Sequence, residues 1–177
     1  MASQIRTRVQ ALSIIGILVA LIAFYAVDGR AQGRGGPLKQ QLLGTWALTS
    51  VSLEQGGNTR QQFGSDPKGI LILDPSGHFS VMTARSGLSK FASNNREKGT
   101  PEENQAIVQG SIAYFGRYSI SEDDRVLTYH VEASTFPNWT GADQNRLVDL
   151  RGDELRITTP TPAVGAGTVT TVYRRVK

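Results

Sequence analysis

Four polar side chains that could bind a ligand or transfer a proton alternate with apolar residues in two neighbouring segments of the chain. His130 and Glu132 lie in the first segment, and Gln144 and Arg146 lie in the second. If the segments are antiparallel strands, the register that sets Glu132 opposite Arg146 also sets His130 opposite Val148, and directly paired residues share a face. The four polar residues would then form one patch.

The chemistry of this patch depends on the face of the sheet that carries it. On an inner face, Arg146 could hold a ligand carboxylate or enolate, while Glu132 partly neutralises it and His130 donates, accepts or shuttles a proton. Glu132 could equally be only the structural counter-ion of a buried arginine. On an outer face, the Glu132–Arg146 pair would be solvated and worth only about 0–1 kcal/mol.

The apolar residues of the two segments point to different answers. Val148 and Leu150 alternate in step with Arg146, which places Arg146 and Glu132 inside. The other interpretation takes the apolar row of the first segment as the inner one and leaves the patch outside; that row is Leu127, Tyr129, Val131 and Ala133. Both interpretations stay open on the sequence alone.

Three aromatic residues are further candidates for ligand contact. Trp46 begins a predicted strand, and Tyr118 alternates with Gly116 and Ile120, so its side chain is predicted to point inward. A buried Tyr118 hydroxyl needs a hydrogen-bond partner from protein, water or ligand. Trp139, in the loop between the two polar segments, could rim a binding site or pack it shut.

The elements that position these residues are predicted to be short strands, because apolar residues recur at period two between clusters of turn residues. Asp74-Pro75-Ser76-Gly77 has the residue order of a type I turn, and residues 122–124 and 151–153 are short polar hairpin connections. Eight strands are predicted: Gly44–Glu54, Gly69–Asp74, His78–Ala84, Gly116–Ser121, Val126–Ser134, Gln144–Leu150, Glu154–Thr159 and Thr168–Val176.

One segment interrupts the strand pattern. Thr100 suits a helix N-cap, Pro101 suits the first helical position, and the two glutamates that follow complement the positive end of the helix dipole. Apolar residues at helical spacing continue as far as Tyr114. With the polar loop of residues 85–99, this helix forms an insertion between the third and fourth predicted strands that could act as a lid.

A flat sheet of eight strands would leave two exposed edges. Closure into a barrel removes both edges and makes an interior that can hold one small ligand. We therefore expect an all-β fold, an eight-stranded antiparallel up-and-down barrel with one short inserted helix. A two-sheet sandwich is the alternative.

Composition excludes several classes of protein and site. The 177-residue chain has no cysteine, which excludes disulfides, thiolate chemistry and Cys-bound metal. With only two histidines, no phosphate-binding glycine loop and no dinucleotide fingerprint, we expect no metal and no cofactor. Half of the net charge of +4 lies in residues 1–31, and no basic stripe with interleaved aromatics follows, so no nucleic-acid partner is expected. The oligomeric state is left open.

The N-terminal residues have the three-part layout of a secretory signal peptide. Arg6 and Arg8 precede a mostly apolar run, residues 11–27, and Gly29 and Ala31 are the small residues of a cleavage site. We expect a periplasmic or secreted protein; an uncleaved leader would instead anchor the domain to the membrane, facing outward, as its one membrane contact. The expected parts are a signal peptide (1–31), a flexible linker (32–41) and one folded domain (42–177).

Several local motifs together resemble the bacterial lipocalin-like domain family. They are Gly44-Thr45-Trp46 at the start of the first strand, then Phe63–Gly69, Ile70–Ile72, Asp74–Ser80, Tyr114–Tyr118, Tyr129–Gly141 and Gln144–Arg146. The resemblance covers about residues 42–176 and implies a lipocalin-like barrel in which Trp46 plugs the closed end. It implies no particular substrate.

Three functions are compatible with these residues. The first is non-catalytic binding of a small hydrophobic or amphipathic, acidic ligand in the barrel, with Arg146 as the polar anchor. The second is a cofactor-free isomerase, cyclase or hydrolase that uses His130, Glu132 and Arg146. The third is a structural barrel filled by its own side chains. The orientation of the polar patch decides among them.

Overall fold

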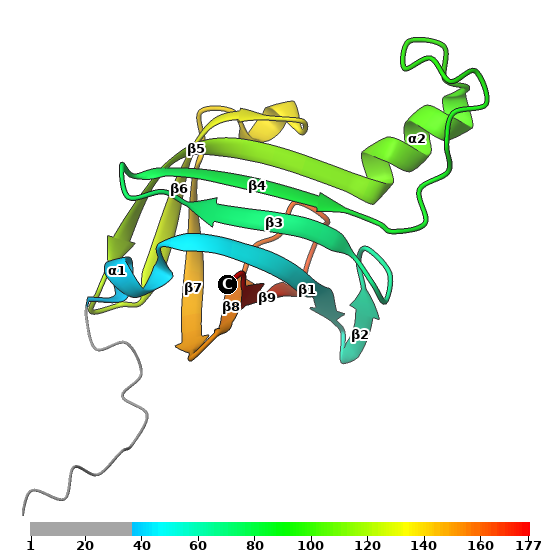
Figure 1. Cartoon of the computed structure of the whole chain (residues 1–177). Helices are drawn as coiled ribbons and strands as arrows, with labels where there is room; N and C mark the ends of the chain where they lie inside the picture. Colours follow the sequence, from blue (N-terminus) through cyan, green and yellow to red (C-terminus); the bar gives the residue numbers. More distant parts are fainter. Residues whose placement is uncertain (1–36) are drawn as a thin grey trace, which may run out of the picture. The chain divides into compact units, whose positions relative to one another are not determined.

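The computed structural model describes residues 37–177, in which antiparallel strands wind into a closed barrel (Figure 1). The strands within these residues are β1 (Gly44–Gln55), β2 (Asn58–Gln61), β3 (Lys68–Leu73), β4 (His78–Ala84), β5 (Ser111–Ser121), β6 (Val126–Ser134), β7 (Asp143–Arg151), β8 (Glu154–Thr159) and β9 (Thr168–Arg175). Two helices, α1 (Leu38–Leu42) and α2 (Pro101–Gly110), and the short 3-10 helix η1 (Pro137–Trp139) complete the described part. The expected signal peptide lies outside these residues.

Eight of the strands close the barrel, and β2 is an addition to it. β1 pairs with β3 on one side and with β9 on the other, so the sheet has no free edge around the ring. β2 pairs with the far half of β1 through a turn in which Gly56 and Gly57 have φ +57° and +78°, values that glycine adopts easily in a tight hairpin. The predicted eight-stranded barrel is confirmed. β2 was not predicted, because all four of its residues are exposed and carry no apolar alternation.

The inserted helix differs from the prediction in its place and its length. α2 lies between β4 and β5 instead of the third and fourth strands, because β2 adds one strand before it. The helix begins as expected: Thr100 accepts a hydrogen bond from the Glu103 N–H (3.2 Å), and the Glu103 carboxylate accepts one from the Thr100 N–H (2.8 Å). It ends at Gly110, so Tyr114, which was expected on the helix, belongs to β5 instead.

The end of the barrel next to α1 is closed by packed apolar side chains. Leu38 and Leu42 of α1 are buried, and the Glu122 carboxylate accepts hydrogen bonds from the Leu38 and Lys39 N–H groups at 2.6 and 2.9 Å. The orphan donors at the start of α1 are thereby satisfied. The last residues of the expected linker, 38–41, are therefore part of the folded domain.

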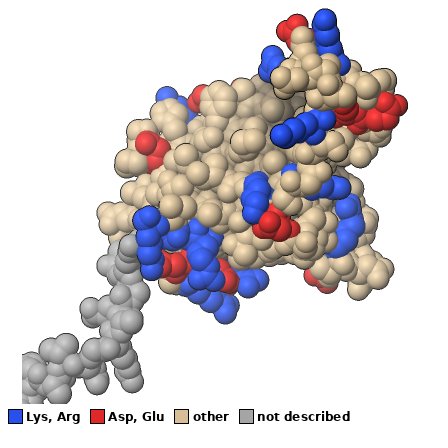
Figure 2. Space-filling model, turned by 45° about the vertical axis from the view of Figure 1, so that its right-hand side comes forward, with Lys and Arg blue, Asp and Glu red and all other residues tan. Residues whose placement is uncertain are grey.

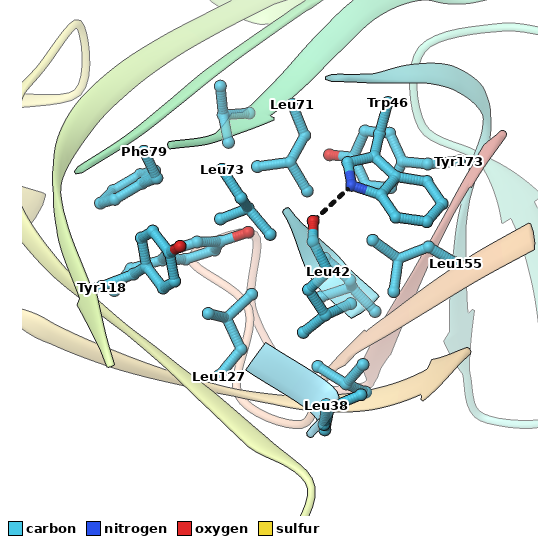
Figure 3. Packing of buried hydrophobic residues seen from close by; sticks show 14 of the residues in the cluster. Leu38, Leu42, Trp46, Leu71, Leu73, Phe79, Tyr118, Leu127, Leu155 and Tyr173 are labelled. Atoms are coloured by element: carbon cyan, nitrogen blue, oxygen red, sulfur yellow. Dashed lines mark hydrogen bonds between the residues drawn. The ribbon is translucent and has the colours of Figure 1, made fainter. Parts of the chain in front are cut away.

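Trp46 belongs to the buried cluster at this closed end and lies next to Tyr173 and Leu155 (Figure 3). Its side chain is fully buried, and its indole N–H donates to the Leu42 carbonyl at 2.9 Å. The Arg175 guanidinium lies 4.0 Å from the centre of the indole ring and donates to the carbonyls of Leu43 and Gln41. Trp46 and Arg175 thus fix α1 against the strands.

Loops of several lengths surround the opposite end of the strands. They include the β1–β2 turn, the loop of residues 135–142 with η1, and the segment that carries α2, which stands away from the strands in Figure 1. Lys and Arg lie beside Asp and Glu on the face shown in Figure 2. Within residues 37–177, no helix has the length and apolar character needed to cross a membrane.

Candidate ligand site inside the barrel

The register of β6 and β7 decides which side chains face the interior. Leu127 pairs with Arg146 and Tyr129 pairs with Gln144. The expected pairing of Glu132 with Arg146 is therefore wrong. The observed register turns the apolar rows of both strands inward at once, which the expected register could not do.

The expected polar patch is divided between two faces by this register. Arg146 and Gln144 lie inside and are buried, at 8% and 9% exposure. His130 and Glu132 lie on the outer face, where their side chains are 42% and 49% exposed. Glu132 is 3.6 Å from Arg117, so it is not the counter-ion of Arg146.

Arg146 carries a buried positive charge. Its guanidinium donates to the Gln144 side-chain oxygen and to the Asn145 carbonyl (3.0 Å), and lies 5.9 Å from the centre of the Tyr129 ring. Within residues 37–177, no aspartate or glutamate pairs with it. A buried charge without a counter-ion is costly, and an anionic ligand group would remove that cost.

Three tyrosines from different strands are close enough to Arg146 to interact with its charge: Tyr114 of β5, Tyr129 of β6 and Tyr173 of β9. Burial raises the pKa of each hydroxyl, most clearly for Tyr129 and Tyr173, while the positive charge of Arg146 opposes the shift. The hydroxyls are therefore neutral donors at ordinary pH. The Tyr129 and Tyr173 hydroxyls have no hydrogen-bond partner within the described part of the chain.

Aromatic rings extend from Arg146 toward the end of the barrel that carries η1. Phe79 stacks on Tyr129 with ring centres 4.2 Å apart, and Tyr114 lies edge-on to both rings at 5.7 and 5.9 Å. Trp139 of η1 is edge-on to Tyr114 at 5.1 Å, and Phe136 is edge-on to Trp139 at 5.7 Å. The interior near Arg146 thus combines one cation, hydroxyl donors and a wall of flat rings.

The remaining expected site residues lie elsewhere. Trp46 belongs to the closed end, and the Tyr118 hydroxyl donates to the Asp74 carbonyl at 2.8 Å, so that hydroxyl is already satisfied. Burial, and next the charge of Asp74, raise the pKa of Tyr118. Of the six expected residues, only Arg146 and Trp139 lie at the aromatic cluster.

Sequence reasoning missed the three tyrosines of the site and the Phe79 ring that stacks on one of them. Tyr114 was assigned to the helix. In a longer β5 it would alternate in step with Gly116 and Tyr118 and would therefore have been predicted to point inward. Tyr129 was considered an inner residue but not a ligand contact, and Tyr173 was not singled out. Requiring both apolar rows of β6 and β7 to face inward would have placed Arg146 on the opposite face from His130 and Glu132, as observed.

The comparisons with known proteins agree with this architecture. The sequence profile of the lipocalin-like domain matches residues 43–173. The 4'-hydroxy-3'-methoxypropiophenone carrier protein of Aspergillus oryzae (strain ATCC 42149 / RIB 40) is 31% identical over 94 residues, which are 50% of this chain and 85% of that protein. The chain therefore belongs to the lipocalin-like domain family.

Proposed function

We propose that the protein is a carrier that binds a small amphipathic ligand inside the barrel, with the acidic group of the ligand on Arg146. The observation that carries the proposal is the buried guanidinium of Arg146, which has no carboxylate partner in the described part of the chain. A ligand anion would supply the missing charge through charge-assisted hydrogen bonds. The hydroxyls of Tyr129 and Tyr173 would add neutral donors beside it.

The surroundings of Arg146 favour an aromatic ligand. Arg146 is the fourth residue of β7, so three residue steps, about 10 Å along the strand, separate it from the start of β7 at the end that carries η1. A single ring with short substituents matches this depth and would lie against Phe79, Tyr114 and Tyr129. A long acyl chain would extend past the rim, since packed side chains fill the closed end.

The relative from Aspergillus oryzae supports the same class of ligand. Its name describes a carrier of a hydroxylated aryl ketone, a single ring with short substituents. In such a compound the hydroxyl is para to the ketone, which makes it more acidic than an ordinary phenol. The oxygen of an acidic phenol would pair with the Arg146 guanidinium, and its ring would pack against the aromatic side chains of this barrel.

Binding of 4'-hydroxy-3'-methoxypropiophenone to the full-length protein tests the proposal by calorimetry. We expect saturable binding at one site, and an absorption change toward the phenolate at a pH where the free compound is mainly neutral. Arg146→Met should weaken binding at least tenfold. Arg156→Met is the matched control, because Arg156 is an exposed arginine of β8.

Two results would contradict the proposal. One is equal binding by the wild type and Arg146→Met. The other is a lack of binding by the wild type to a panel that includes hydroxylated aryl ketones, aromatic carboxylates and fatty acids. Binding of fatty acids alone would retain the carrier function and reject the aromatic ligand.

The enzyme alternative required His130, Glu132 and Arg146 on one face. They lie on opposite faces of the β6–β7 pair, so no catalytic function is proposed for that set.

We further propose that the carrier acts outside the cytoplasm, in the periplasm or secreted. The support is the order of basic, apolar and small residues in positions 1–31. Mass spectrometry of protein recovered from the native host should find an N-terminus at Gln32. Recovery of the intact chain in the cytoplasmic fraction would reject this assignment, and recovery in the membrane fraction would favour an anchored form.

A further inference from the structure

The outer face of the barrel carries a second group of interacting polar side chains. Ser119 of β5, His130 of β6 and Asp143 of β7 lie on three consecutive strands. The Ser119 hydroxyl oxygen is 3.0 Å from His130 Nε2, and His130 Nδ1 is 2.7 Å from the Asp143 carboxylate. These residues face away from Arg146 and take no part in the proposed ligand site.

The two contacts assign a direction to the hydrogen bonds. An ionised carboxylate can only accept, so Asp143 requires the hydrogen of a neutral imidazole to be on Nδ1. Nε2 then carries the lone pair and accepts the hydrogen of the Ser119 hydroxyl. This is the order of nucleophile, base and orienting carboxylate that activates a serine in acyl transfer, a constellation recognised by geometry and not by sequence position.

We propose that Ser119, His130 and Asp143 form a catalytic site that hydrolyses small esters with good leaving groups. Ser119 is the nucleophile and His130 the general base, while Asp143 is a positioning residue. Ser119 is exposed on an open sheet face, so small acyl groups can reach it from solvent. Arg117, which pairs with His130 across β5 and β6 and is 66% exposed, adds a cation on the same face, where it also lies 3.6 Å from Glu132.

The reaction proceeds in two balanced steps. The Ser119 oxygen bonds to the ester carbonyl carbon and its proton passes to His130 Nε2, while Arg117 stabilises the negative carbonyl oxygen. The bond to the leaving group then breaks, and the alcohol leaves with the proton from His130. In the second step, water gives a proton to His130 and attacks the acyl-Ser119 ester. The carboxylic acid leaves, and the serine regains its proton.

The test uses the full-length protein with two probes, p-nitrophenyl acetate for turnover and a fluorophosphonate for covalent labelling. We expect hydrolysis above the buffer rate and a mass adduct on the peptide that contains Ser119. Ser119→Ala should remove the adduct and lower the rate at least tenfold, and His130→Ala should do the same. Ser80→Ala is the matched control, because Ser80 is an exposed outward serine of β4.

Asp143 needs a separate comparison, since its role is indirect. Asp143→Asn should slow labelling of Ser119 at least tenfold, and Asp143→Glu should restore part of the rate, with unchanged circular dichroism in both variants. The proposal is overturned if the wild type shows no adduct on Ser119, or if Ser119→Ala hydrolyses the ester as fast as Ser80→Ala. Either result leaves ligand binding at Arg146 unaffected.

Discussion

Arg146 lies directly opposite Leu127 in the pairing of β6 with β7, so a charged guanidinium and a fully buried leucine share the inner face of the barrel. The arginine is held there by the strand register and not by an ion pair. Its neighbours are an amide oxygen, a backbone carbonyl and aromatic rings. In the ligand-free protein such a charge lowers the stability of the fold. At this position, the residue that suits ligand binding therefore differs from the residue that suits folding.

Replacement of Arg146 should therefore stabilise the free protein. Arg146→Met keeps the length of the side chain and removes the buried charge, and we expect a gain of about 1–3 kcal/mol in the free energy of unfolding. Urea denaturation without ligand measures it. Arg156→Met should change stability by about 1 kcal/mol at most, since it removes one surface ion pair with Glu154. A clear loss of stability in Arg146→Met would show that the arginine has a structural role.

Arg175, the other arginine with little exposure, should behave in the opposite way. Arg175→Met removes the donors to the Leu43 and Gln41 carbonyls and the cation over Trp46. We expect a loss of about 2–4 kcal/mol, since two hydrogen bonds to a charged group and a buried cation–π contact disappear together. Arg174→Met, at an exposed position of the same strand, is the control. An unchanged unfolding midpoint for Arg175→Met would refute the role assigned to this contact.

Gly116 should tolerate no side chain. A Cβ there would lie 2.0 Å from the His130 carbonyl oxygen, at the point where the β5–β6 register shifts and Glu132 has no partner. Gly116→Ala is expected to destabilise the barrel by about 2 kcal/mol or more, because backbone atoms must move. At Gly87 a Cβ would meet nothing within 4 Å, so Gly87→Ala should be close to neutral. Equal stability of the two variants would contradict the bulge.

Most strands could be predicted from the sequence, because period-two alternation and turn residues determine them locally. Closure was expected because it removes two exposed sheet edges, and the pairing of β1 with β9 confirms it. The ends of elements were less predictable. Residues 111–114 continued an apolar pattern compatible with a helix, and only their pairing with residues 81–84 of β4 shows that they are extended. The local sequence of β2 carries no apolar signal at all.

The site was only partly predictable for a related reason. A register error by an odd number of residues reverses the relation between the faces of two strands, so His130 and Glu132 were grouped with Arg146 although they lie on the other side. The bulge at Glu132 also interrupts the alternation of inner and outer residues along β6. Ala133 therefore points outward although Val131 points inward. Residues that approach the site from another strand across the barrel, such as Tyr173, cannot be recognised from the spacing of residues in their own segment.

The buried tyrosines should make the protein sensitive to alkali. Burial raises the pKa of Tyr129 and Tyr173, so above pH 10 the unfolded chain loses protons that the folded chain retains. The free energy of unfolding then falls as pH rises, by about 1.4 kcal/mol per pH unit for each such tyrosine. Absorbance at 295 nm and circular dichroism, followed together, should show these tyrosines ionising only as the fold is lost. Tyr129→Phe should reduce the slope by about one proton, whereas reversible ionisation near pH 10 with an intact fold would contradict burial of these hydroxyls.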